Sequence, residues 1–308
     1  MGHGKLRKFK ENETFRCLLQ PDASDVMEKG PEGLTIKPHP VKGQWNGTVF
    51  SVPGPIVLEL GCGRGEYTID LALRNPLCNY VGVDIKGARL WKGAKYAEEH
   101  DLGNVAFLRT RIEFIEAFFA PGEISEIWLT FSDPQLKSEN NRLTSPLFLE
   151  RYRKFLKPGG TVHLKTDSRF LYEYSKAVAE ENGLEILAAT PDLYGEGRDS
   201  LHGSPVETVC GKDAVDALFD VQTYYERMFL SMGLKITYLS FRIDHDGDYV
   251  RPAGFDSKYW REAEGDRRSF GHSPQQSSAD SPSGPSDSPS RSSAPPSRSS
   301  DSSSPQKS

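Results

Sequence analysis

The sequence predicts an α/β fold, with a mostly parallel sheet of seven strands, helices on both of its faces and a disordered tail. Short apolar segments alternate with helical patterns between residues 55 and 241. Such alternation builds βαβ units, in which right-handed crossovers join parallel strands. A glycine-rich turn directly after the first apolar segment is typical of these folds. Residues 272–308 are almost all Ser, Pro, Asp, Arg, Gln or Ala, a composition with too little apolar surface to fold.

The first three strands are short runs of apolar, β-branched and aromatic residues, which favour strands. A helical pattern follows each of them. We expect these strands at residues 55–60, 80–84 and 105–109, and the helices at 67–74, around 90–97 and at 114–119.

The second half of the domain continues the alternation with four more strands. We expect them at residues 126–131, 161–165, 184–189 and 235–241, with helices at 146–156 and 223–232. The helix 146–156 is expected to stop at Lys157-Pro158-Gly159-Gly160, because glycine and proline terminate helices. The final strand–helix–strand order closes a seven-stranded sheet.

Composition sets the outer boundaries of this domain. The first ten residues hold Lys5, Arg7, Lys8 and Lys10 and few apolar side chains, which predicts a flexible basic arm. We therefore divide the chain into a basic arm with its lead-in, a folded domain, a C-terminal extension and a Ser/Pro-rich disordered tail. The corresponding ranges are 1–50, 51–245, 246–271 and 272–308.

Several classes of protein are disfavoured by the sequence. Its 4 cysteines form no CxxC pair and its 7 histidines no HExxH motif, so neither a zinc site nor a disulfide framework is expected. The sequence contains no apolar run of about 18 residues, the length that would suggest a membrane-spanning helix. A cytoplasmic protein is therefore expected. The net charge of −5 argues mildly against a nucleic-acid partner, although local basic patches can override that sum.

The sharpest local motif is Glu59-Leu-Gly61-Cys-Gly63-Arg-Gly65, between a strand and a helix. Ligands of open α/β sheets bind beyond the carboxyl ends of the strands, and glycines there let the backbone approach the ligand closely. The GxGxG spacing differs from the GxGxxG of dinucleotide binders. A carboxylate two residues before it suits the cationic amino and sulfonium groups of S-adenosylmethionine better than a pyrophosphate. A nucleotide site or an empty glycine-rich turn are the alternatives.

Asp84 ends the second strand, where a carboxylate can accept hydrogen bonds from both ribose hydroxyls. A solvated aspartate at a strand end is the structural alternative. The turn Arg111-Ile112-Glu113 follows the third strand and should flank the adenine. These features reinforce each other because they lie on one edge of the sheet.

From Leu58 to Phe241 the chain resembles the tRNA (guanine-N7-)-methyltransferase family. The resemblance implies a Rossmann-like domain that transfers a methyl group from S-adenosylmethionine to guanine N7 in tRNA, at position 46 of the variable loop. FSDP, RLTSP and LKTD are its more specific parts, since GxGxG is common to most methyltransferases. It is carried by LELGCGRGEYT, YVGVDIKGARLW, NVAFLRTRIEFI, IWLTFSDPQLK, NRLTSPLFLERYRKFLKPGG, HLKTDSRFLYEYS and TYYERMF.

The resemblance also implies roles for individual residues, with Asp133 as the catalytic residue. The cofactor contacts that it implies are Glu59, Asp84 and Asp133, to which the position of the glycine-rich turn and of the turn after the third strand adds Gly61, Gly63, Arg111 and Ile112. The implied substrate contacts are Lys137, Asp167, Thr223 and Glu226.

Three positions depart from the family pattern. Pro134-Gln-Leu-Lys137 stands where the family commonly has PWPK, and residues 138–142 replace a strongly basic run. Arg111 takes the place of an acidic residue expected near the adenine. The adenine contact therefore falls to Glu113 or to a backbone amide.

The proposed chemistry needs little from the protein beyond orientation and charge. Guanine N7 already carries a lone pair, so the site has only to hold it in line with the methyl–sulfur bond. A carboxylate at Asp133 would stabilise the positive charge that develops on the purine.

Each candidate residue also has a purely structural interpretation. Asp133 can initiate an Asp-Pro turn, Asp167 can cap a helix, and Lys137 can be an ordinary surface lysine. Thr223-x-x-Glu226 fits a capping box, which would not prevent a role in substrate binding.

Three functions remain open at this point. The first is a tRNA methyltransferase with tRNA as its partner, no metal and a monomeric or homodimeric state. The second is a methyltransferase acting on a small molecule or protein, suggested by the weakened basic loop after Lys137. The third is a non-catalytic RNA-binding module that keeps the fold.

Overall fold

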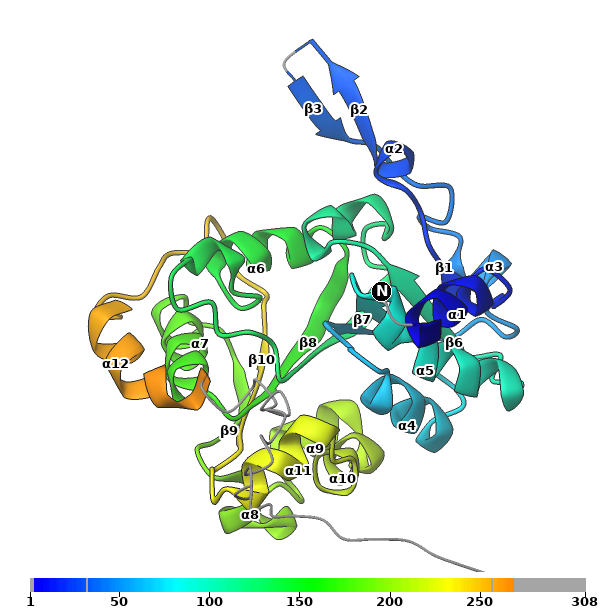
Figure 1. The fold of residues 1–308 in the computed structure, drawn as a ribbon. Coiled ribbons are helices and arrows are strands. Elements are labelled where there is room, and N and C mark those ends of the chain that lie inside the picture. The colour runs from blue at the N-terminus through cyan, green and yellow to red at the C-terminus, as the bar shows by residue number, and fades with distance from the viewer. Residues whose placement is uncertain (1–2, 32, 256, 269–308) are drawn as a thin grey trace, which may run out of the picture. The chain divides into compact units, whose positions relative to one another are not determined.

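The computed structural model describes residues 3–31, 33–255 and 257–268. The predicted disordered tail, residues 272–308, lies outside the described residues. A mixed sheet of eight strands forms the centre of the domain (Figure 1). Its strands are β1 (Leu18–Leu19), β4 (Ile56–Leu60), β5 (Asn79–Asp84), β6 (Val105–Arg109), β7 (Ile124–Thr130), β8 (Leu156–Thr166), β9 (Ile186–Thr190) and β10 (Thr237–Arg242).

The strand order is β1-β6-β5-β4-β7-β8-β10-β9. All neighbouring strands are parallel except β10, which runs antiparallel to β8 and β9. The predicted mostly parallel α/β sheet is confirmed, but the predicted strand number is not. The additional strand, β1, is only two residues long and pairs with β6 at the edge, where Leu18 lies opposite Phe107.

Helices cover both faces of the sheet, as predicted. The larger ones are α1 (His3–Asn12), α4 (Glu66–Arg74), α5 (Gly87–Glu99), α6 (Pro146–Arg153), α7 (Arg169–Glu181), α9 (Pro205–Cys210), α10 (Lys212–Asp220), α11 (Tyr224–Ser231) and α12 (Ser257–Arg268). The short elements are α2 (Ala23–Val26), α3 (Trp45–Thr48), α8 (Leu193–Glu196) and the 3₁₀ helices η1 (Ile112–Ala117), η2 (Glu139–Asn141) and η3 (Arg198–Ser200).

Alternation along the strands divides the apolar core between the two faces. On β6, Ala106 and Leu108 pack with α6 and α7 residues in one cluster. Val105 and Phe107 pack with residues of α4, α5 and α10 in the other cluster. The central strands are therefore buried on both sides, which explains why they read as almost continuous apolar runs.

The N-terminal segment differs from the flexible arm that its composition predicts. Residues 3–12 form α1, which packs on α5. The Asn12 amide donates to the Gly87 carbonyl at 2.9 Å, and the Trp91 indole N–H donates to Glu11 at 2.7 Å. The Lys8 ammonium lies 4.4 Å from the centre of the Trp91 ring. These are tertiary contacts, which the composition of ten residues does not reveal.

Two other predicted elements have different boundaries. The helix expected at 146–156 ends at Arg153, and β8 already begins at Leu156 and runs through Pro158. The helical run expected at 114–119 is the 3₁₀ helix η1. A hairpin of β2 (Met27–Gly30) and β3 (Gly33–Ile36) was not predicted. The helices of the described part of the chain are too short or too polar to serve as membrane spans.

Candidate active site

The predicted site residues gather at the edge formed by the carboxyl ends of the parallel strands. Gly61 follows β4, Asp84 ends β5, Asp133 follows β7 and Asp167 follows β8. The strand order reverses at β4, because β5 and β6 lie to one side of it and β7 and β8 to the other. Open α/β sheets bind their ligands at such a reversal.

The glycine-rich turn has a backbone that only glycine adopts readily. Gly61, Gly63 and Gly65 have φ of +81°, +58° and +73°. A Cβ on Gly61 would have no neighbouring heavy atom within 4 Å, whereas a Cβ on Gly65 would lie 2.6 Å from the Phe107 ring. Gly65 thus permits close packing inside the domain, while Gly61 and Gly63 border open space that a ligand can enter.

Asp84 holds this turn in place. Its carboxylate accepts hydrogen bonds from the Gly63 amide at 3.1 Å and from the Lys86 amide at 2.7 Å. The sequence placed Asp84 and the glycines on one edge of the sheet, and the structure brings them into direct contact. The bond also adds a role in shaping the turn, which the motif did not indicate.

Glu59 does not project into the open space next to the turn. Its buried carboxylate accepts hydrogen bonds from the Thr68 amide at 2.9 Å, the Thr68 hydroxyl at 2.5 Å and the Thr130 hydroxyl at 2.6 Å. Burial raises the pKa of Glu59 to about 7, although the bonds from Thr130 and Thr68 partly oppose this shift. Glu59 thus ties α4 to the end of β7, one residue before the segment that carries Asp133.

The turn after β6 places Arg111 and Glu113 against each other. The Arg111 guanidinium lies 3.1 Å from a Glu113 carboxylate oxygen, and both side chains are largely exposed. Ile112 begins η1 and is partly buried against the core. The carboxylate that could replace the expected acidic residue near the adenine is therefore already paired.

The segment after β7 has an unusual backbone. Phe131 and Gln135, on either side of Ser132-Asp133-Pro134, have φ of +53° and +48°. Such conformations are costly for residues other than glycine and concentrate at functional sites. Asp133 is exposed, and its carboxylate accepts a hydrogen bond from the Gln135 amide at 2.9 Å.

Arg142 holds this segment by a hydrogen bond to its backbone, a role that the sequence did not reveal. Its Nε donates to the Pro134 carbonyl at 3.2 Å. Its guanidinium carbon lies 4.6 Å from the centre of the Phe170 ring and 4.5 Å from that of Tyr174. Arg142 belongs to the quoted RLTSP segment, but nothing in that segment identifies its partners.

Lys137 is exposed on the rim of a cleft of about 500 Å³. The C-terminal extension also lines this cleft and contributes Arg251 and Phe255. Arg251 pairs with Glu139 at 3.3 Å. The cleft thus places three basic side chains, Lys137, Arg142 and Arg251, near the segment that carries Asp133.

Thr223 and Glu226 form the predicted capping box at the start of α11. The Thr223 hydroxyl accepts from the Glu226 amide at 3.2 Å, and the Glu226 carboxylate accepts from the Thr223 amide at 3.3 Å. The Glu226 side chain is fully buried, which differs from a residue that projects toward a substrate. Direct substrate contact by this carboxylate would require it to leave its partners.

Those partners surround Lys165, a buried residue in the LKTD segment and the second-to-last residue of β8. Its ammonium contacts a Glu226 carboxylate oxygen at 2.5 Å and donates to the Tyr67 hydroxyl at 2.6 Å and the Leu218 carbonyl at 2.5 Å. These three acceptors match its three N–H groups. Burial lowers the pKa of Lys165 to about 8, against the opposing effect of Glu226. No local signal in the sequence links these residues.

Helix α11 also contacts both loops of the site. The Arg64 guanidinium, in the glycine-rich turn, lies 5.4 Å from the centre of the Tyr224 ring. The rings of Phe131 and Phe229 have centroids 6.4 Å apart. Helix α11 therefore joins the turn after β4 to the segment after β7.

Asp167 is half-buried, but it is not the helix cap that its position suggested. The cap of α7 is Ser168, whose hydroxyl accepts from the Leu171 amide at 3.1 Å. Glu264 of α12 reinforces this cap, since its carboxylate accepts from the Ser168 hydroxyl at 2.8 Å and the Phe170 amide at 2.7 Å. A residue of the C-terminal extension thus fixes the turn that carries Asp167.

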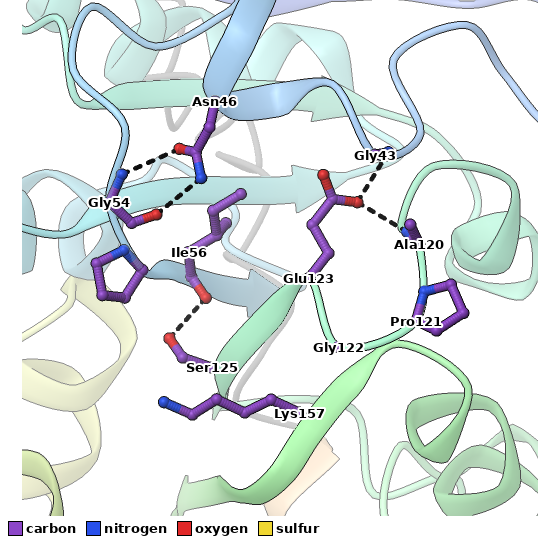
Figure 2. A pocket seen from close by; sticks show the side chains of 11 residues that line it. Gly43, Asn46, Gly54, Ile56, Ala120, Pro121, Gly122, Glu123, Ser125 and Lys157 are labelled. Atoms are coloured by element: carbon purple, nitrogen blue, oxygen red, sulfur yellow. Dashed lines mark hydrogen bonds between the residues drawn. The ribbon is translucent and has the colours of Figure 1, made fainter.

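A second pocket, of about 520 Å³, lies at the opposite edge of the sheet, where Ile56 begins β4 and Ser125 is the second residue of β7. Figure 2 shows hydrogen bonds between several of its polar groups, among them Asn46 with Gly54 and Ser125 with the Ile56 carbonyl. Glu123 accepts from the Gly43 and Ala120 amides at 3.0 and 2.7 Å. This pocket is therefore separate from the edge where the predicted site residues gather.

Comparisons with known proteins identify the family of this chain. A family model described as "Putative methyltransferase" matches residues 53–204. The tRNA (guanine-N(7)-)-methyltransferase of Bacteroides thetaiotaomicron is 45% identical over 252 residues, which cover 82% of this chain and 90% of that protein. The protein of the same name from Porphyromonas gingivalis is 48% identical over 241 residues, covering 78% of this chain and 90% of that protein.

Proposed function

Because this chain belongs to the tRNA (guanine-N(7)-)-methyltransferase family, we propose that it transfers a methyl group from S-adenosylmethionine to guanine N7 in tRNA. One observation carries this proposal. The open glycine-rich turn and the exposed Asp133 follow β4 and β7, the neighbouring strands at the reversal of strand order. A donor bound at the first and a base held at the second would meet at the edge of the sheet.

The residues on the donor side fit S-adenosylmethionine, which supplies a methyl group on a positively charged sulfur. Gly61 and Gly63 leave space beside the backbone, and Asp84 places a carboxylate at the end of β5 for the ribose hydroxyls. The backbone around Arg111 and Ile112 would flank the adenine. Glu59 would support the donor site without contacting the donor. Its buried carboxylate accepts hydrogen bonds from Thr68 and Thr130 and so positions α4 and β7.

On the substrate side, the chain's task is orientation. Guanine N7 has its own lone pair, so no residue has to remove a proton from it. Asp133 would place its carboxylate beside the purine, where it stabilises the positive charge that appears on the ring during transfer. Lys137, Asp167 and Thr223 would hold the base and neighbouring phosphates in line with the donor.

We further propose that the guanine lies at position 46 of the variable loop and that the enzyme acts in the cytoplasm, where its tRNA substrate is found. Both points follow the family resemblance. The experiment that tests the function incubates the purified full-length chain with S-adenosylmethionine and unmodified bulk tRNA, and then maps the methylated nucleotide.

We expect N7-methylguanosine at position 46 and no product when 7-deazaguanine replaces that base. Methylation that survives this replacement would overturn the assignment to N7. Methylation of a different guanine would leave the chemistry in place and overturn only the position.

A further inference from the structure

Three potential metal ligands converge on one sheet face, away from the carboxyl-end edge. Glu126 lies near the start of β7, His163 lies within β8 and Cys210 ends α9. Their ligand atoms all lie within 4.8 Å of one another. His163 Nε2 is 3.4 Å from a Glu126 carboxylate oxygen and 3.6 Å from the Cys210 sulfur. The proposed methyl transfer assigns no role to any of the three.

We propose that Glu126, His163 and Cys210 bind a Zn²⁺ ion. Zinc takes oxygen, nitrogen and sulfur ligands in tetrahedral geometry. With zinc–ligand bonds of about 2.0–2.3 Å, neighbouring ligand atoms of a tetrahedron lie about 3.3–3.8 Å apart. The two distances from His163 Nε2 already fall in that range. A carboxylate and a thiolate together carry the two negative charges that balance the ion.

The surroundings of His163 fix the ring as a ligand requires. Its Nδ1 lies 2.7 Å from the Tyr238 hydroxyl, which can accept an Nδ1–H and leave the Nε2 lone pair directed at Glu126 and Cys210. The Trp128 ring stacks on His163 with centroids 4.2 Å apart, and its indole N–H donates to Glu126 at 3.3 Å. Two of the three ligands therefore have outer partners that hold their orientation.

The same geometry argues against a nucleophilic Cys–His–Glu triad. In such a triad the carboxylate and the nucleophile bind opposite nitrogens of the imidazole. Here Glu126 and Cys210 both face Nε2, while Tyr238 occupies Nδ1. Three groups that converge on one point are suited to holding an ion rather than to relaying a proton.

A small pocket gives the site access to solvent and room for a fourth ligand. The pocket has a volume of about 120 Å³ and is lined by Glu126, Cys210 and Cys78, among others. A water molecule fits such a space and would complete the tetrahedron. The ion would fasten the end of α9 to β7 and β8, and α9 and α10 lead directly to Thr223 and α11.

The test is a zinc titration of metal-free, full-length protein, followed by calorimetry and thermal unfolding. We expect one equivalent of Zn²⁺ per chain and a Tm that rises with zinc concentration. Cobalt in place of zinc should give a thiolate-to-metal charge-transfer band. Cys210→Ser and Glu126→Gln should each lose the tight equivalent, and Cys210→Ser should also lose the band.

Cys17→Ser is the matched control. Cys17 is half-buried like Cys210, but its sulfur contacts the Ala94 carbonyl at 3.5 Å, among residues of α5. It should bind zinc as the unchanged chain does. The absence of a stoichiometric site, or equal zinc binding by the Cys210 and Cys17 variants, would overturn the proposal. Methyl transfer to tRNA is measured separately, so either result leaves the proposed function to its own test.

Discussion

The two sides of the carboxyl-end edge are held together in different ways. At the ends of β4 and β5, the backbone itself shapes the site, since Gly63 has a positive φ and its amide binds Asp84 directly. At the ends of β7 and β8, the site is shaped by contacts between side chains of distant segments, such as the buried ion pair of Lys165 and Glu226. The donor side therefore depends on local backbone geometry that a motif encodes. The substrate side depends on partners that no motif connects.

The largest loss of stability on the substrate side is expected when one member of its buried ion pair is removed. Lys165→Met leaves the fully buried Glu226 carboxylate without its cation. An unpaired buried charge costs about 3–5 kcal/mol, so we expect a loss of that size in the free energy of unfolding. Urea unfolding, followed by circular dichroism, measures it.

A second variant separates the ion pair from simple packing. In Lys165→Met combined with Glu226→Gln the buried charge is gone, and we expect part of the lost stability to return. A double variant that is as unstable as the sum of both single variants would show that Lys165 and Glu226 are not coupled.

Asp133 should affect rate without affecting stability. It is exposed, and its carboxylate accepts a local hydrogen bond from the backbone N–H of Gln135. We expect Asp133→Ala to lower kcat for tRNA about 10²–10³-fold, the loss seen when one group that stabilises developing charge is removed. Unfolding should be unchanged. Asp133→Asn keeps the shape and an acceptor for Gln135, so a comparable loss there would assign the effect to the charge.

A rate like that of the unchanged enzyme in both Asp133 variants would refute the catalytic assignment. A loss confined to Asp133→Ala would instead assign Asp133 to shaping the turn between Phe131 and Gln135, whose positive φ values already constrain it.

The same contrast explains what the sequence could predict. Strand β6 has the predicted bounds, and Asp84 was placed beside the glycine-rich turn, because short-range patterns determine both. The helical state of residues 3–12 depends on contacts with α5, and the support of Pro134 by Arg142 depends on ring packing in α7. Such contacts join segments far apart in the chain, where spacing carries no information.

On the donor side, we expect Glu59 to make the stability of the protein depend on pH. Burial raises its pKa from 4.5 to about 7 in the folded chain. Between these values the folded state binds more protons than the unfolded state, so stability falls as the pH rises from 4.5 to 7. The loss amounts to about 3 kcal/mol at most and is complete above pH 7.

Glu59→Gln should remove this component of the pH dependence. The glutamine oxygen can still accept from Thr68, and its amide can donate to the Thr130 hydroxyl. We therefore expect the unfolding free energy of the unchanged protein to fall relative to that of Glu59→Gln as the pH rises from 4.5 to 7. A constant difference across that window would contradict the raised pKa.

The smallest effect is expected at Glu264, where the C-terminal extension reaches the substrate side. Its buried carboxylate binds the Ser168 hydroxyl and the Phe170 amide at the start of α7. Glu264→Gln removes a negative charge from a helix N-terminus and should cost about 1 kcal/mol.

Because Ser168 follows Asp167 directly, the variant should also raise the KM for tRNA while kcat changes little. Glu262→Gln, at an exposed position of the same helix, is the matched control and should alter neither constant. Equal KM values for the two variants, with stability lost only in Glu264→Gln, would mean that α12 supports the fold without positioning Asp167. A raised KM in Glu264→Gln alone would place the extension within the substrate-binding apparatus, since a purely structural cap would not change that constant.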